Sequence, residues 1–307
     1  MILALSLSAC GGSSSGSGRS SSGSGSVSGG SDNGSGGIDN APEPSGGQNN
    51  LGFEFSAPTG NQIRPGVTVS ADGAQCTSNF LYALNDQTVY LGVAAHCFSF
   101  DSNSGIDPCE SRNLPIGFDQ VVVENASRPA TLVYSSWVAM QQEGETPGSA
   151  ACVYNDFALV RLHPDDVANI HPAVRSLGGP TSLARGTAAV GDAVVLYGRA
   201  PATLDLEPLQ VREGEIVEVL GGGWSYDVTL DGVVAPGDSG GPVLTGDGRA
   251  LALINVLALN ISADSLLSPL RGGVSNLDRS LEYAKANGFI QRGVTLLTWS
   301  EFTTPLL

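Results

Sequence analysis

Three stretches of the chain place a histidine, an aspartate and a serine in surroundings that suit a nucleophilic site. His96 ends the apolar run in GVAAHCF, Asp156 begins the apolar run in YNDFALVRL, and Ser239 lies in APGDSGGPVL. A serine hydroxyl is a weak nucleophile near neutral pH and needs a base within hydrogen-bond reach. Histidine has a suitable pKa, and a buried carboxylate can fix its tautomer and stabilise the imidazolium that forms. The three residue types therefore indicate acyl transfer through a serine nucleophile.

The serine stretch is poor in side chains, since glycines stand at 237, 240 and 241. A surface turn has this composition. So does a nucleophile that needs bare backbone N–H groups around it, because a tetrahedral oxyanion is stabilised by preorganised donors. Because the chain also contains the His96 and Asp156 motifs, we favour the interpretation that Ser239 is a nucleophile.

In the order His, Asp, Ser, these stretches resemble the signature segments of the chymotrypsin-like serine proteases over about residues 62–290. The resemblance implies two antiparallel six-stranded β-barrels with the active site in the cleft between them. It implies Ser239 as nucleophile, His96 as general base and then acid, and Asp156 as the orienting carboxylate. It also implies that the backbone N–H groups of Gly237 and Ser239 form the oxyanion hole.

In this family the carboxylate before the nucleophile, here Asp238, pairs with a cation and supports the oxyanion loop. The domain start, NQIRPGVTVS, lacks the Ile-Val-Gly-Gly sequence that supplies a new N-terminus in animal relatives. It is more similar to the bacterial branch typified by streptogrisin, in which an arginine side chain serves. Arg199 in LYGRAP is the predicted partner, and a solvated surface arginine is the alternative.

The specificity pocket is predicted from the same resemblance. Val233 stands six residues before the nucleophile, where the pocket floor is set, and the pocket wall is expected at Asn255, Val256 and Leu257. These residues favour small or medium apolar side chains in the substrate. Asp231 lies only two residues from Val233, so a shift in register would reverse the preference.

The five cysteines are Cys10, Cys76, Cys97, Cys109 and Cys152. Without Cys10 an even number remains, which allows three disulfide pairings. We favour Cys76–Cys97, which closes a short loop, and Cys109–Cys152, which joins segments farther apart. In the resembled family, Cys76–Cys97 corresponds to the disulfide that braces the histidine loop. No C-x-x-C spacing is present, so no zinc site, other metal or cofactor is expected.

The N-terminal residues differ from the rest of the chain. Residues 1–10 are apolar, and Leu7-Ser8-Ala9-Cys10 resembles a bacterial lipoprotein signal in which Cys10 is lipidated. The stretch 11–50 is rich in Ser, Gly, Asn and Asp, a composition typical of a disordered linker. We expect an exported protein, membrane-anchored or extracellular or periplasmic, whose protease domain spans 51–307. Its two barrels are expected at about 62–175 and 176–290.

The remaining composition indicates a mainly β fold. Short apolar runs separated by turn formers such as DG, GD and PG recur from about residue 62, which is typical of a sandwich or barrel. One C-terminal helix is predicted in SNLDRSLEYAKANG, with Ser275 as N-cap and Gly288 as the stop.

His163 and His171 fall in a loop-like stretch and are predicted to be exposed. The stretch DSNSGID at 101–107 fits a polar surface loop better than a calcium loop.

The net charge of −16 argues against nucleic acid as a partner, because phosphate binding needs clustered Lys and Arg. The expected partner is a protein or peptide substrate, and the protein is expected to be a monomer. A catalytically weak binding or regulatory module on a protease fold is the alternative function. An α/β-hydrolase is excluded, because that fold needs G-x-S-x-G and the order Ser, Asp, His.

Overall fold

The computed structural model describes residues 50–303 except 103, 204–205, 207–208 and 256–269. All described residues belong to the unit Gly46–Leu307. The predictions for the signal, for Cys10 and for the linker up to residue 49 lie outside them, as do those for Val256 and Leu257. In the described part of the chain, no helix is long and apolar enough to cross a membrane.

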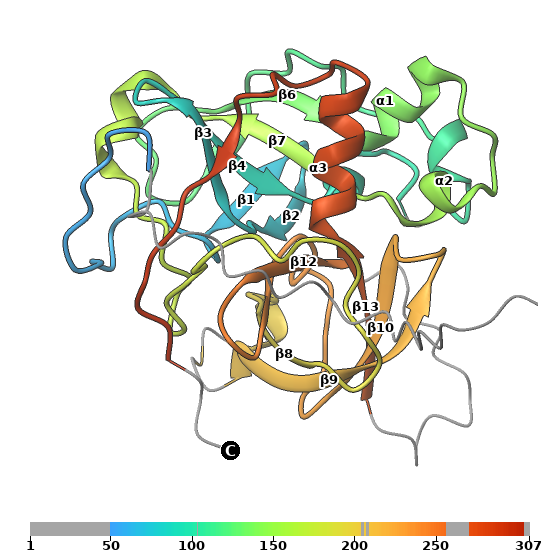
Figure 1. Ribbon diagram of the computed structural model, residues 1–307. Helices are drawn as coiled ribbons and strands as arrows, with labels where there is room; N and C mark the ends of the chain where they lie inside the picture. Colours follow the sequence, from blue (N-terminus) through green and yellow to red (C-terminus); the bar gives the residue numbers. More distant parts are fainter. Residues whose placement is uncertain (1–49, 103, 204–205, 207–208, 256–269, 304–307) are drawn as a thin grey trace, which may run out of the picture. The chain divides into compact units, whose positions relative to one another are not determined.

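Two antiparallel sheets, which we call the N-terminal sheets, are built mainly from the first half of the chain (Figure 1). One has the order β2-β1-β5 and the other the order β14-β3-β4-β7-β6. The turn between β1 and β2 has a positive φ at both Asp72 and Gly73, the conformation that a tight Asp-Gly hairpin requires. The strands are β1 (Thr68–Ala71), β2 (Ala74–Thr77), β3 (Leu81–Asn85), β4 (Thr88–Val93), β5 (Val122–Val123), β6 (Thr131–Ser135), β7 (Ala158–Arg161) and β14 (Thr295–Leu296).

Six further strands form a closed barrel, which we call the C-terminal barrel, in the order β10-β13-β12-β11-β8-β9. Leu196, Tyr226 and Val243 are among the side chains that fill it, each fully buried. The strands are β8 (Ala193–Tyr197), β9 (Val211–Leu220), β10 (Ser225–Leu230), β11 (Pro242–Thr245), β12 (Ala250–Asn255) and β13 (Leu270–Asn276). The all-β prediction is confirmed, with six strands in the second barrel, whereas the strands of the first half are divided between two sheets.

Helices are few and short. The predicted C-terminal helix is α3 (Leu277–Ala286), but its N-cap is Asn276, whose side chain accepts a hydrogen bond from the Arg279 N–H. Ser275 does not cap it, because this residue still pairs with Ser225 and Leu253 in the β-ladders. The sequence did not predict α1 (Ser136–Glu143) or α2 (Ala150–Tyr154). The 3₁₀ turns are η1 (Ala95–Phe98), η2 (Pro108–Glu110), η3 (Pro164–Asn169) and η4 (Pro201–Thr203).

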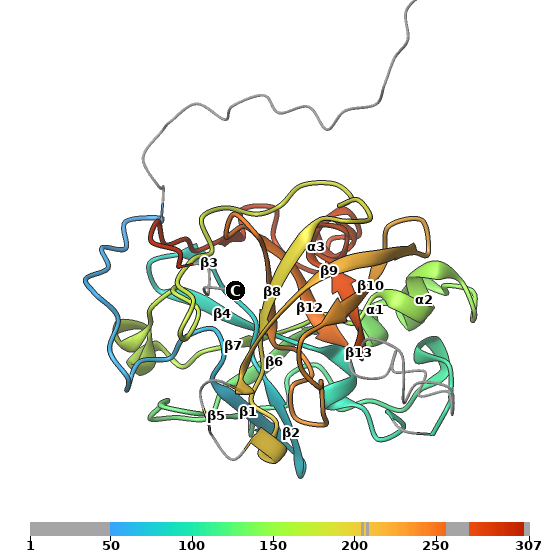
Figure 2. The same cartoon turned by 90° about the horizontal axis from the view of Figure 1, so that it is seen from below.

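The segment after α3 returns to the N-terminal sheets, where β14 pairs with β3. The Thr298 N–H donates to the side-chain oxygen of Asn50 at 3.0 Å, so the first described residue is held beside this segment. Figure 2 shows β1, β2 and β5 on the opposite side of the picture from α3, with the gold turn η4 beside β2. The residues just before η4 are bonded to β2, since the Arg199 N–H donates to the Thr77 hydroxyl at 3.0 Å.

Candidate active site

His96 lies in η1, directly after β4, and is 8% exposed. The disulfide Cys76–Cys97 joins the residue after His96 to β2. The second disulfide, Cys109–Cys152, joins η2 to α2. Both predicted pairings are confirmed, and the first fixes the histidine turn against the end of β2.

Asp156 lies between α2 and β7 and is 2% exposed. Its Oδ2 is 2.7 Å from His96 Nδ1, and its Oδ1 accepts a hydrogen bond from the His96 backbone N–H at 2.8 Å. An ionised carboxylate only accepts hydrogen bonds, so the proton of the neutral imidazole is on Nδ1. His96 Nε2 is then left with a free lone pair, which a general base needs.

Ser136 fixes the chain on both sides of Asp156. Its hydroxyl donates to the Asn155 carbonyl at 2.7 Å and accepts from the Phe157 N–H at 3.0 Å. Ser136 is fully buried at the start of α1. This hydroxyl therefore helps to hold the aspartate at the position from which it reaches His96.

The loop around Ser239 packs directly on the N-terminal sheets. The Thr77 N–H donates to the Ser239 carbonyl at 2.9 Å, and the Asn79 side chain donates to the Gly240 carbonyl at 3.1 Å. A Cβ at Gly240 would lie 2.8 Å from the Ala94 nitrogen, so only glycine allows this approach. Because Ala94 is two residues before His96, the packing places the serine beside the histidine turn.

Ser239 is 5% exposed. Among the described residues, the structure contains no hydrogen bond between Ser239 Oγ and His96. Catalytic hydrogen bonds are often long without substrate and tighten in the substrate complex.

Two backbone N–H groups are available beside Ser239. Within the described part of the chain, neither the Gly237 N–H nor the Ser239 N–H donates to another protein group. Gly237 has φ +105°, a conformation that L-residues with a side chain rarely adopt, and a Cβ there would lie 2.7 Å from Pro201 Cδ. The two donors fit the predicted oxyanion hole.

Asp238 is fully buried and pairs with Arg212, not with Arg199. Its Oδ2 is 3.0 Å from Arg212 Nη2 and accepts from the Ala235 N–H, and its Oδ1 accepts from the Ala200 N–H at 2.8 Å. Burial raises the pKa of Asp238, and the Arg212 charge and these hydrogen bonds oppose that rise.

The prediction that the Arg199 side chain pairs with Asp238 is therefore wrong, although the backbone of the next residue does contact Asp238. The residue after Arg199, Ala200, donates its N–H to Asp238. The Arg199 guanidinium instead pairs with Glu124, at the end of β5. Arg212 was missed because it lies on another strand, β9, where it is 3% exposed.

Of the four predicted pocket residues, Val233 and Asn255 lie in the described part of the chain. Val233 is 60% exposed, and Asn255 is buried at the end of β12. Asp231, whose position made the register uncertain, accepts a hydrogen bond from the Glu213 N–H through Oδ1 at 2.9 Å. One residue that the sequence did not indicate is Trp137, whose ring centroid lies 6.4 Å from that of His96.

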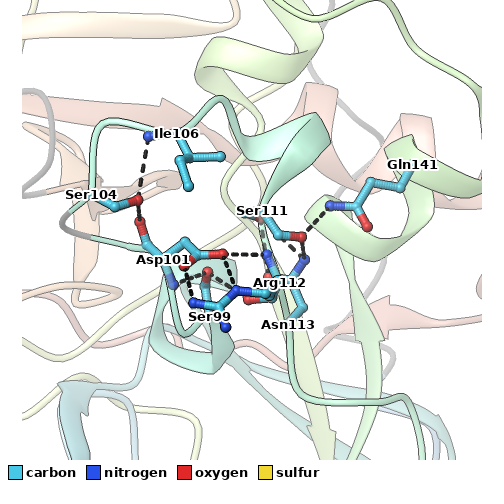
Figure 3. A network of polar contacts seen from close by, with 8 residues as sticks. All are labelled: Ser99, Asp101, Ser104, Ile106, Ser111, Arg112, Asn113 and Gln141. Carbon is cyan, nitrogen blue, oxygen red and sulfur yellow. Dashed lines mark hydrogen bonds and ion pairs between the residues drawn. The ribbon is translucent and has the colours of Figure 1, made fainter.

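After His96, an ion pair joins Asp101 to Arg112 (Figure 3). Asp101 accepts hydrogen bonds from Arg112 at the backbone N–H, at Nε and at Nη2. These bonds lower the pKa of Asp101. The carboxylate is thus committed to an arginine, which agrees with a polar loop in preference to a calcium loop.

A cavity of about 820 Å³ lies away from this site and is lined in part by Phe53, Phe55 and His171. His171 is fully buried, so the prediction that it is exposed is wrong. Its Nε2 lies 2.8 Å from the Ser56 carbonyl, and its Nδ1 accepts from the Ala173 N–H at 3.0 Å. The pKa of His171 is lowered, mainly because burial disfavours its charged form.

A sequence model described as "Trypsin-like peptidase domain" matches residues 86–253, more than half of the chain. The chain belongs to the trypsin-like peptidase domain family. It is a serine endopeptidase, a hydrolase of peptide bonds, and its partners include protein or peptide substrates. No curated protein sequence matches the chain.

Three solved structures are similar to this peptidase. Protease A of Thermobifida fusca is 19% identical with a TM-score of 0.45, covering 77% of this chain and 98% of that chain. Nocardiopsis protease is 15% identical with a TM-score of 0.43, covering 76% and 98%. A glutamic acid specific serine protease is 18% identical with a TM-score of 0.46, covering 76% and 100%.

Proposed function

We propose that this peptidase cleaves peptide bonds through an acyl-enzyme on Ser239, with His96 as general base and acid and Asp156 as its orienting partner. The observation that carries the proposal is the pair of contacts from Asp156 to His96, at Nδ1 and at the backbone N–H. They fix both the ring and its tautomer, which is what a base for serine needs.

The reaction proceeds in two halves. Ser239 Oγ attacks the substrate carbonyl carbon while His96 Nε2 takes the hydroxyl proton, and the oxyanion accepts hydrogen bonds from the Gly237 and Ser239 N–H groups. The imidazolium then gives its proton to the leaving amine as the C–N bond breaks, which leaves the acyl-enzyme. Water repeats the sequence with His96 as base, and the acid product leaves Ser239 free.

The buried Arg212–Asp238 pair supports a site that is active without a new N-terminus. Asp238 needs a cation to remain charged in a site without solvent, and the chain supplies one from β9. For the substrate, Val233 favours small or medium apolar side chains before the scissile bond.

We further propose that the protein is exported and anchored through a lipid on Cys10. The sequence Leu7-Ser8-Ala9-Cys10 and the Ser- and Gly-rich stretch after it support this. The protein and a Cys10→Ser variant would be expressed in a bacterial host fed a labelled fatty acid. Label and membrane association are expected in the first and absent in the second, and equal label in both would contradict the anchor.

Labelling of the full chain with a fluorophosphonate probe tests the catalytic assignment. Such probes react with serines that are activated by a base and an oxyanion hole. We expect labelling of the wild-type chain, and none of the Ser239→Ala or His96→Ala variants. A folded wild-type protein that fails to label would contradict an assembled site and favour a binding module.

A further inference from the structure

Thr77, the last residue of β2, contacts the oxyanion loop of the C-terminal barrel through both its backbone and its side chain. Its N–H donates to the Ser239 carbonyl at 2.9 Å, and its hydroxyl donates to the Gly237 carbonyl at 2.7 Å. The same hydroxyl accepts a hydrogen bond from the Arg199 N–H at 3.0 Å. Thr77 is fully buried, so water does not compete for these bonds.

The two carbonyls that Thr77 binds lie on either side of Asp238. They belong to Gly237 and Ser239, the residues whose N–H groups are the candidate oxyanion donors. Gly237 has no Cβ to restrict its backbone, so its conformation must be fixed by its contacts. The peptide that follows Gly237 is held at its carbonyl by Thr77 and at its N–H by the Ala235 carbonyl, at 3.0 Å.

Thr77 is in turn joined to a charged bridge between the N-terminal sheets and the loop after β8. Arg199 donates its backbone N–H to Thr77 and pairs its guanidinium with Glu124. Glu124 also accepts from the Thr68 N–H at 2.9 Å and from Arg175 Nη2 at 3.0 Å. The carboxylate is thus held by β1 while it holds Arg199.

We propose that Thr77 is a positioning residue for the oxyanion hole. Its hydroxyl fixes the Gly237 carbonyl, and the Glu124–Arg199 pair holds the loop after β8, whose Arg199 N–H donates to the same hydroxyl. Thr77 does not touch the reacting atoms. It acts by keeping the Gly237 and Ser239 N–H groups aimed at the position of the oxyanion. The inference rests on the proposed function and adds a residue outside the Ser-His-Asp set.

Thr77→Val tests the proposal, because it keeps the shape of the side chain and removes the hydroxyl. The Gly237 carbonyl then loses a donor and the Arg199 N–H loses an acceptor. We expect kcat for a peptide substrate to fall by about tenfold to a hundredfold, with KM changed by less than about threefold. Thr77→Ser keeps the hydroxyl and is expected to restore kcat to within about threefold of wild type.

A peptide aldehyde inhibitor separates positioning from general damage. It forms a tetrahedral adduct on Ser239 whose oxygen occupies the oxyanion hole, so it resembles the transition state. In Thr77→Val its affinity is expected to weaken in parallel with kcat/KM. The matched control is Thr245→Val on β11, where the hydroxyl is bonded to Asp247 and Arg249 and not to the oxyanion loop. It is expected to leave both quantities unchanged.

A folded Thr77→Val variant with wild-type kcat would overturn the proposal, as would a loss that Thr77→Ser does not restore. If Thr77→Val does not fold, Glu124→Gln takes its place, with an expected fall in kcat of about threefold to tenfold at unchanged KM. Wild-type kcat in that variant would also overturn it. A wild-type protein without Ser239-dependent hydrolysis would contradict the proposed function itself.

Discussion

Two buried aspartates, Asp238 and Asp156, differ in the charge of the groups that they contact, and this difference separates their proposed roles. Asp238 is paired with a permanent cation, Arg212, so its charge is balanced in every step. Among the described residues, the hydrogen bonds of the Asp156 carboxylate go to the His96 ring and to the His96 backbone N–H, and not to a permanent cation. Its charge is balanced when His96 becomes protonated. In the proposed mechanism, Asp156 therefore stabilises the imidazolium that forms during the reaction, whereas Asp238 is proposed to stabilise the resting shape of the loop.

Asp156→Asn tests the first of these roles. The new side-chain amide donates to His96 Nδ1, which moves the imidazole proton to Nε2 and removes the base. We expect kcat to fall by roughly 10⁴-fold with little change in folding. The measurement is peptide hydrolysis against the Ser239→Ala background, with a thermal melt to confirm the fold. A loss of less than about tenfold would contradict the role of Asp156.

Arg212→Met tests the second role. The change leaves Asp238 buried without its cation, so we expect the free energy of unfolding to fall by about 3–5 kcal/mol near neutral pH. Burial already raises the pKa of Asp238, and loss of Arg212 raises it further. A carboxyl whose pKa is raised on folding stabilises the fold only while protonated, so its contribution is lost as pH rises through the raised pKa.

Urea unfolding across the acidic and neutral range measures this effect. The deficit of Arg212→Met relative to wild type should grow as pH rises. The double variant Arg212→Met with Asp238→Asn removes the buried charge and should recover part of the stability. A deficit that is the same at every pH would show that Asp238 is not the group responsible.

At the scale of elements, His171 joins the chain's first described segment to the C-terminal one. It bonds to Ser56, and its ring contacts Phe55 at 5.4 Å and Trp299 at 4.8 Å between centroids. Both ring nitrogens are used in the neutral form, because Nδ1 accepts from Ala173. Protonation would remove that acceptor, and Arg64 nearby further disfavours the charge.

This arrangement predicts that the contacts of His171 stabilise the fold less in acid than at neutral pH. The pKa of His171 is lowered on folding, so the unfolded chain binds a proton first as pH falls. Stability should therefore decline below about pH 6.5, the ordinary histidine value. His171→Asn should be less stable by roughly 1–3 kcal/mol at neutral pH and show a weaker decline in acid. Thermal melts against pH measure it, with the half-exposed His163→Asn as control, and parallel curves would contradict it.

How far the sequence predicted the elements depends on whether a local pattern determines them. The Asp72-Gly73 turn and α3 follow from turn chemistry and helical periodicity. The helix cap was wrong by one residue, because Ser275 is used by two β-ladders that no local pattern shows. The short helix α1 depends on burial of Trp137 and Met140 against other parts of the fold, so tertiary packing and not propensity forms it.

The same distinction applies to the site. His96, Asp156 and Ser239 lie in motifs whose local sequence shows their chemistry, and both disulfides follow from few alternatives. Arg212 and Thr77 do not, because their importance comes from contacts with segments far along the chain. A buried arginine on a strand has no local signal that distinguishes it from an exposed one.

In the whole molecule, the site is divided between two structural parts. His96 follows β4 and Asp156 precedes β7, two strands of the N-terminal sheets, and Ser239 comes from the loop before β11 of the C-terminal barrel. Hydrogen bonds from Thr77 and Asn79 to residues 237–240 cross between them. The segment after α3 crosses as well and ends in β14 on the N-terminal sheets. Catalytic geometry therefore depends on how firmly these contacts hold the two parts together.

The cation that pairs with Asp238 is a side chain of the same chain, Arg212. Because Arg212 is a side chain within the barrel, we expect the oxyanion loop to form when the chain folds, with no cleavage needed to create a partner. The full chain, with its mass confirmed as intact, should react with a fluorophosphonate at its final rate and without a lag. A variant with a specific cleavage site inserted before residue 50 should change in rate by less than about twofold on cutting. An intact chain that labels only after cutting would show that Arg212 does not suffice, and that the N-terminal residues control the site.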